Sequence, residues 1–150
     1  MRYICVHRLM DLTRGMFYCP TTGHSLRNNM TTSVRSYRDL FVWQKAMELV
    51  KRIYRLAGGF PAHERYGLAD QMRRSAVSIP SNIAEGQARQ HTAEFRQFLY
   101  VALGSLAELE TQSLIAHDVG YLSAVELNDV EVLLSEIRRM LHGLIKQLPK

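Results

Sequence analysis

Residues 123–148 read SAVELNDVEVLLSEIRRMLHGLIKQL, and this stretch decides the class of fold. It opens with Ser123, followed three residues later by Glu126, which is the spacing of a capping box at a helix start. Apolar side chains then recur about once per helical turn as far as Pro149, namely Leu127, Val130, Leu134, Ile137, Leu141, Leu144 and Leu148. The stretch therefore predicts an amphipathic helix that buries one face.

Three more segments with helical spacing precede it. The first runs from about Asp39 to Ala57 and ends at Gly58-Gly59, the second begins near Glu64, and the third begins after the expected N-cap Thr92 and stops near Gly120. The apolar stripe expected for the first helix comprises Trp43, Ala46, Met47, Val50, Ile53, Tyr54 and Ala57. The residues expected in the core of the assembled domain are Trp43, Met72, Ile79, Ile83, Phe98, Leu106 and Ile137.

Four helices joined by short connections pack most simply as an all-α, antiparallel up-down-up-down four-helix bundle, and no β pattern competes with this. We assign the bundle to residues 36–150. Several apolar residues lie off the main stripes, including Leu103 and Leu114 in the third helix and Val132, Leu133 and Ile145 in the fourth. A monomer needs only one apolar face per helix, so this surplus predicts a homo-oligomer.

Residues 1–35 show no sustained helical or strand period and carry turn formers throughout, so we expect a disordered or irregular N-terminal arm. Internal methionines at Met10, Met16 and Met30 leave open the alternative that translation begins downstream of Met1. The only two cysteines, Cys5 and Cys19, fall in this arm and are expected to be free thiols, without a disulfide or a zinc site.

Composition favours a soluble protein, with 47% hydrophobic and 22% charged residues and no apolar run near the roughly 18 residues of a membrane span. No secretory signal opens the sequence, so the cytoplasm is the expected location. The formal charge of +5 is uneven, because residues 1–35 hold five arginines against one acid, a net of +4.

Within the bundle the first half is the basic one. Residues 36–100 carry ten Lys or Arg against six acids, whereas residues 101–150 carry four against seven. If phosphates are contacted, the candidate residues for nucleic-acid binding are Lys45, Lys51, Arg52, Arg55, Arg73 and Arg74. The alternative is an ordinary solvated face, in which Glu48 pairs with Lys51 and Arg52, and Asp70 with Arg73 and Arg74.

A proline lies inside the second helix. Pro80 lacks a backbone N–H and crowds the carbonyl group of Ala76, so a kink or a broken turn is expected there. The neighbouring Ser78, Ser81 and Asn82 have short polar side chains that can bond freed backbone groups. Structural repair is the preferred interpretation of this cluster over a ligand site, and a subunit contact stays open.

Four motifs in this sequence resemble the family of four-helix bundle proteins also known as 23S rRNA intervening-sequence proteins. They are LFVWQKA at 40–46, GLADQMRRSA at 67–76, SIPSNIAEG at 78–86 and the segment from Glu94-Phe95 to SLAELET at 105–111, within a match that spans roughly residues 36–148. The SIPSNIAEG run, which includes Ser78, Pro80, Ser81, Asn82, Glu85 and Gly86, is the most specific.

The resemblance implies a left-handed four-helix bundle that assembles into a ring-like homopentamer. It also implies a likeness in fold to accessory proteins of diversity-generating retroelements, which form basic barrels that bind nucleic acid and a reverse transcriptase. The family name records a location in rRNA genes and does not define an activity.

No catalytic or metal-binding constellation appears in the sequence. A di-iron bundle needs glutamates from facing helices and two Glu-x-x-His motifs, and neither is present; His91 and Glu94 occur in the reverse order. We therefore expect a non-enzymatic protein without metal or cofactor. Two functions remain: a sequence-tolerant binder of RNA or DNA, and a protein–protein adaptor or scaffold without direct nucleic-acid contact.

Overall fold

The computed structural model describes residues 36–149, which form a bundle of four long helices. A short 3-10 helix, η2 (Tyr37–Asp39), leads into α1 (Phe41–Gly58), and a second, η3 (Ala62–Tyr66), precedes α2 (Leu68–Gln87). The helices α3 (Thr92–Asp118) and α4 (Ala124–Gln147) complete the bundle. The N-terminal arm predicted for residues 1–35, with both cysteines, lies outside the described residues.

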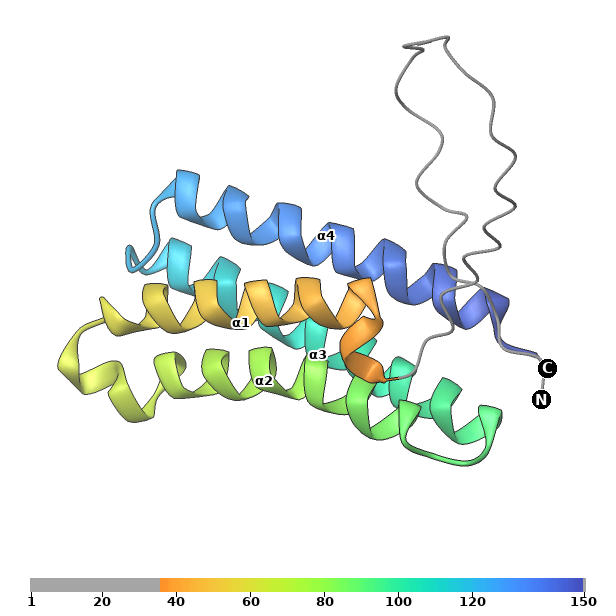
Figure 1. The fold of residues 1–150 in the computed structure, drawn as a ribbon. Coiled ribbons are helices and arrows are strands. Elements are labelled where there is room, and N and C mark those ends of the chain that lie inside the picture. Colours follow the sequence, from red (N-terminus) through yellow and green to blue (C-terminus); the bar gives the residue numbers. More distant parts are fainter. Residues whose placement is uncertain (1–35, 150) are drawn as a thin grey trace, which may run out of the picture.

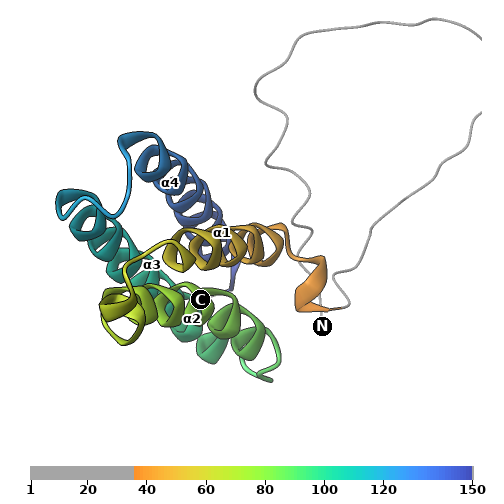
Figure 2. The same cartoon turned by 90° about the vertical axis from the view of Figure 1, so that its left-hand side faces the viewer.

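Successive helices run in opposite directions, as Figure 1 shows, and each packs against its neighbours along the chain, while α4 closes the bundle against α1. The view turned by 90° in Figure 2 shows the same four helices closer to end-on. The helix α3 therefore lies diagonally across the bundle from α1. The predicted all-α, antiparallel four-helix bundle is confirmed.

Local signals account for the start of α4 and the end of α3. The capping box of α4 forms as predicted, because the Ser123 Oγ atom accepts from Glu126 N at 3.3 Å and Glu126 Oε2 accepts from Ser123 N at 2.9 Å. The helix α3 ends where Gly120 adopts a left-handed backbone with φ of 81°, a conformation that glycine takes without strain. These two ends are set by the residues beside them.

Two predicted helix starts were wrong. The N-cap of α3 is His91, without a side-chain hydrogen bond, and Thr92 is already helical. The helix α2 begins at Leu68 and not near Glu64, since Gly67 separates it from η3. Glu64 instead caps α2 from outside, because its Oε2 atom accepts a hydrogen bond from Leu68 N at 2.9 Å.

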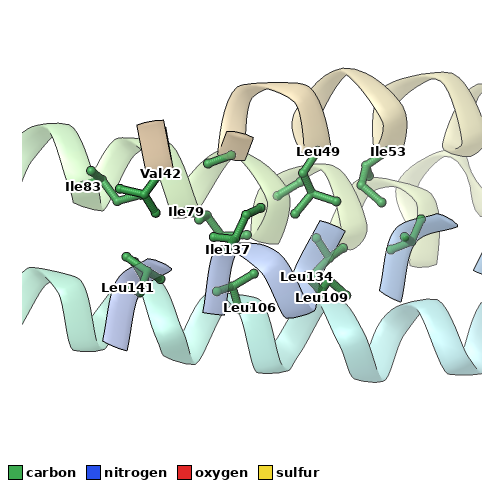
Figure 3. Packing of buried hydrophobic residues seen from close by; sticks show 14 of the residues in the cluster. Val42, Leu49, Ile53, Ile79, Ile83, Leu106, Leu109, Leu134, Ile137 and Leu141 are labelled. Atoms are coloured by element: carbon green, nitrogen blue, oxygen red, sulfur yellow. The ribbon is translucent and has the colours of Figure 1, made fainter. Parts of the chain in front are cut away.

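The core cluster extends from Leu40 to Leu144. Figure 3 shows that it takes side chains from all four helices. Five of the seven predicted core residues, Met72, Ile79, Ile83, Leu106 and Ile137, are fully buried. The other two, Trp43 and Phe98, are only partly buried. The prediction that Trp43 and Phe98 are core residues was only partly right, since both lie at the margin of the packed interior.

The buried face of α1 differs from the predicted stripe. Its centre lies at Val42, Ala46, Leu49, Ile53 and Leu56, whereas Trp43, Met47 and Val50 are partly buried and Tyr54 is 50% exposed. Apolar residues cover a wide arc of this helix, so periodicity alone allowed either half of the arc to face inward. The helix is therefore rotated about its own axis relative to the predicted orientation, and Tyr54 faces solvent.

The closest packing is between α2 and α3, where small side chains let the two helices approach. A Cβ atom on buried Gly86 would lie 2.6 Å from Phe98 Cβ and 2.8 Å from a ring carbon of Phe95. Ser78 Oγ and Ser105 Oγ are 2.8 Å apart across the same interface. Close approach here leaves no room for a side chain at position 86.

Candidate nucleic-acid interface

The cations of α1 divide between two sides of the helix. Lys45 and Arg52, seven residues apart, point toward α4, where Lys45 Nζ lies 3.6 Å from Glu136 Oε2 and Arg52 Nη2 donates to Asp129 Oδ2 at 2.7 Å. Lys45 also bonds Glu48 at 3.0 Å. The hydrogen bond with Glu48, and next the charge of Glu136, raise the pKa of Lys45 above its ordinary value. Both cations are engaged in holding α1 to α4.

The second pair, Lys51 and Arg55, is exposed and lies one turn apart on the outer side of α1. Arg55 Nε donates to the carbonyl oxygen of Lys51 at 3.2 Å, which lays the arginine side chain along the helix. No carboxylate among residues 36–149 forms an ion pair with either residue. The same holds for Arg65, Arg139 and Lys146, which are spread over η3 and α4.

The two arginines of α2 behave differently from each other. Arg74 pairs with Asp70 at 2.9 Å, and its side chain is still 68% exposed, so the pair is weak and open to exchange. Arg73 instead donates through Nη2 to the carbonyl oxygen of Ala57 at 3.0 Å. Its guanidinium carbon also lies 5.7 Å from the centre of the Tyr54 ring, a cation–π distance.

The predicted local pairings were therefore only partly right. Asp70 pairs with Arg74 and not with Arg73, and Glu48 pairs with Lys45 and not with Lys51 or Arg52. Of the six candidate cations, Lys51, Arg55 and Arg73 remain without a carboxylate partner among the described residues. They gather around Tyr54 at the C-terminal half of α1, at a shallow surface hollow lined by Val50, Lys51, Tyr54 and Arg55.

The SIPSNIAEG run is a packing seam between α2 and α3. The Asn82 Nδ2 atom donates to the carbonyl oxygen of Ser78 at 2.7 Å and to its Oγ at 3.0 Å, while Ser81 Oγ donates to the carbonyl oxygen of Val77 at 2.8 Å. These bonds stay within α2, but none of them goes to the carbonyl group of Ala76 that Pro80 leaves without its donor. Pro80 and Gly86 are buried, and Glu85 pairs with Arg89 at the surface.

Of the kink or broken turn expected at the proline, the broken turn was wrong, because α2 continues without interruption from Leu68 to Gln87 through Pro80. The polar side chains bond the carbonyl groups of Val77 and Ser78, and not that of Ala76, which loses the proline's N–H. Side-chain bonds on the next turn and tight packing against α3 stabilise the helix despite the missing donor.

Exposed apolar side chains lie along α3 and at the residue after it, in two groups separated by about four helical turns. Tyr100, Val101, Leu114, Ile115 and Val119 are each between 42% and 53% exposed. Of the off-stripe residues considered earlier, Leu103, Leu133 and Ile145 pack against the core, whereas Leu114 and Val132 are exposed. The signal that marks these side chains is that α3 has apolar residues all around its circumference.

Among residues 36–149, no three His, Cys, Asp or Glu side chains are grouped as ligands for a metal ion. No helix in this part of the chain is long and apolar enough to cross a membrane. His63 and His117 are both in hydrogen-bonding contact, His63 with the Tyr121 hydroxyl at 3.2 Å and His117 with the carbonyl oxygen of Leu122 at 2.9 Å.

The family model of the 23S rRNA-intervening sequence protein matches residues 38–143, which is most of the described bundle. The chain belongs to this family. A crystal structure of a protein of unknown function from the S23 ribosomal protein family of Bacteroides thetaiotaomicron is similar, with 26% identity and a TM-score of 0.66. The match covers 70% of this chain and 95% of that one. None of the curated proteins matches the chain.

Membership in the intervening-sequence family confirms the resemblance based on the four motifs. In this chain the SIPSNIAEG run lies within α2 and packs against α3. The family description names no activity, and the similar crystal structure is described as a protein of unknown function.

Proposed function

We propose that this protein is a non-enzymatic homo-oligomer that binds nucleic acid with little sequence preference. The observation that carries the proposal is the cluster of Lys51, Arg55 and Arg73, cations that no carboxylate among residues 36–149 neutralises. Lysine and arginine side chains bind phosphates, and such contacts carry no sequence information and weaken steeply as salt rises.

Self-association is supported by the exposed apolar side chains along α3, which we call the α3 face. Five large apolar side chains with two-fifths to half of their area in water are costly to leave exposed, and such patches mark contact surfaces. The face lies diagonally across the bundle from α1, so a second copy can bury it while the basic cluster stays in solvent. The family resemblance makes a pentamer the expected assembly. Oligomer symmetry then repeats the basic cluster and raises the number of phosphates that can be bound together.

Light scattering and sedimentation test the assembly. Replacing Ile115 by Arg on the α3 face is expected to give folded monomers, whereas Val125→Arg, at a residue 73% exposed at the start of α4, serves as the matched control and stays oligomeric. A wild-type protein that is monomeric at micromolar concentration would contradict self-association.

Gel shifts with structured RNA and duplex DNA over a range of salt concentrations test binding. The double variant Lys51→Gln/Arg55→Gln is expected to weaken binding. It should also reduce the slope of log K against log salt concentration by about two per bound subunit. The control Lys45→Gln/Arg52→Gln removes the same formal charge from cations that are already paired, and its effect should be smaller. Absence of salt-sensitive retardation in the wild type would refute nucleic-acid binding.

Co-purification from the native host, with and without nuclease, distinguishes the adaptor function from nucleic-acid binding. A partner protein that is lost on nuclease treatment was held through nucleic acid, as the proposal expects. A partner that persists, together with negative gel shifts, would favour a protein–protein scaffold without nucleic-acid contact.

A further inference from the structure

The hollow beside Tyr54 combines apolar surface with positive charge. It is a shallow depression, widely open to solvent, and is lined by Val50, Lys51, Tyr54 and Arg55 of α1. Although two of its four residues are cations, the lining surface is almost entirely apolar, so their aliphatic stems and the aromatic ring form the walls. A ligand that fits this hollow needs a flat or apolar part and an anionic part next to it.

Tyr54 is held in place from the side of α2. Arg73 reaches from α2 to the ring and is itself fixed by its hydrogen bond to the carbonyl oxygen of Ala57. Half of the Tyr54 side chain nevertheless remains in water. An aromatic ring that is positioned by the fold and left half exposed can stack on a ligand at a small cost in conformational entropy.

The flanking cations are also arranged in advance. The bond from Arg55 Nε to the carbonyl oxygen of Lys51 orients the arginine, and both of its terminal nitrogens are left without a protein acceptor among residues 36–149. Lys51, one turn earlier, is exposed and unpaired in the same part of the chain. A phosphate group next to the hollow would meet two such donors.

We propose that this hollow binds an unpaired nucleobase stacked on Tyr54, with the adjoining phosphate on Lys51 and Arg55, so that the protein prefers single-stranded segments to duplex. The inference rests on the proposed nucleic-acid function and names its substrate class. Aromatic platforms flanked by cations are how sequence-tolerant single-strand binders hold bases, whereas the bases of a duplex are stacked on one another and present no free face.

A membrane surface is the competing anionic partner, and the side chains argue against it. Helices that lie in a bilayer interface bury a broad apolar face. The outer side of α1 instead carries Gln44, Glu48, Lys51 and Arg55, with Phe41 and Tyr54 each only half exposed. Vesicle binding is therefore an outcome that would overturn the proposal.

The test uses the full chain, a labelled short oligo(U) strand and an RNA duplex of equal length, followed by fluorescence anisotropy at fixed salt. Tyr54→Ala is expected to weaken binding of the single strand roughly five-fold or more, while changing the affinity for the duplex little. Tyr54→Phe keeps the ring and should retain wild-type binding. Tyr66→Ala is the matched control, since Tyr66 is 85% exposed in η3 and outside the hollow.

Circular dichroism must first establish that Tyr54→Ala is folded; if it is not, the comparison moves to Tyr54→Leu, which keeps apolar bulk without an aromatic face. Equal loss of affinity in the Tyr54 and Tyr66 variants, or equal loss for strand and duplex, would overturn the inference. So would Tyr54-dependent binding to anionic vesicles in place of oligo(U). If Lys51 and Arg55 matter but Tyr54 does not, only this inference fails; if the wild type binds neither nucleic acid, the proposed function fails as well.

Discussion

Replacing Gly86 by Ala should destabilise the bundle, although alanine is the better helix former. The new Cβ atom would lie 2.6 Å from Phe98 Cβ, 0.8 Å short of the 3.4 Å at which ordinary van der Waals contact begins. Phe98 Cβ is attached directly to the backbone of α3, so a rotamer change cannot relieve the clash. The two helices would have to separate or rotate.

The magnitude follows from two opposing effects. Alanine in a helix interior gains about 1 kcal/mol over glycine, and overpacking a filled site costs about 1–3 kcal/mol, occasionally more. The contact with Phe95 at 2.8 Å adds to the strain, so we take the upper end of that range. The expected net loss is about 2 kcal/mol, which corresponds to a fall in Tm on the order of 8 °C for a domain of this size.

Chemical and thermal unfolding measure this change, at one fixed protein concentration because self-association also contributes to stability. Gly58→Ala is the control, since a Cβ atom there meets nothing within 4 Å. It should leave stability unchanged or slightly raised. If Gly86→Ala is as stable as Gly58→Ala, the close approach of α2 and α3 is wrong and the reasoning fails with it.

Three further predictions concern the caps, the core and the ion pairs. Ser123→Ala should cost about 1 kcal/mol at neutral pH. Hydrogen bonds from Ser123 lower the pKa of Glu126. Their contribution to the free energy of unfolding is therefore present above the unfolded-state pKa and is lost as pH falls through the folded-state pKa. Urea unfolding should show that Ser123→Ala loses less stability near pH 3 than at pH 7. Ile79→Ala should cost about 2–5 kcal/mol by the same measurement, and Trp43→Leu clearly less, because Ile79 is fully buried and Trp43 is not. Arg52→Gln should lower stability by less than about 1 kcal/mol, and less again at high salt, because its ion pair with Asp129 is partly exposed to solvent. A larger loss that does not depend on salt would contradict this expectation.

The sequence by itself determined where the helices lie and how several of them end. Each of those features depends on residues a few positions apart, such as Ser123 with Glu126, or the left-handed Gly120 after α3. The deep core of α2 and α4 was predictable for the same reason, because the residues that are fully buried, such as Met72, Ile79 and Ile83 in α2 and Val130, Leu134 and Ile137 in α4, recur at helical spacing.

Only the tertiary structure decided which half of the wide apolar arc of α1 faces inward, and so whether Tyr54 is core or surface. It also decided which cations are neutralised, since Glu136 and Asp129 on α4 pair with Lys45 and Arg52 across a helix interface. Charge counts along the chain gave a basic first half but could not separate paired from unpaired cations. Distances between helices depend on how all four pack together, and no spacing within a single helix encodes them.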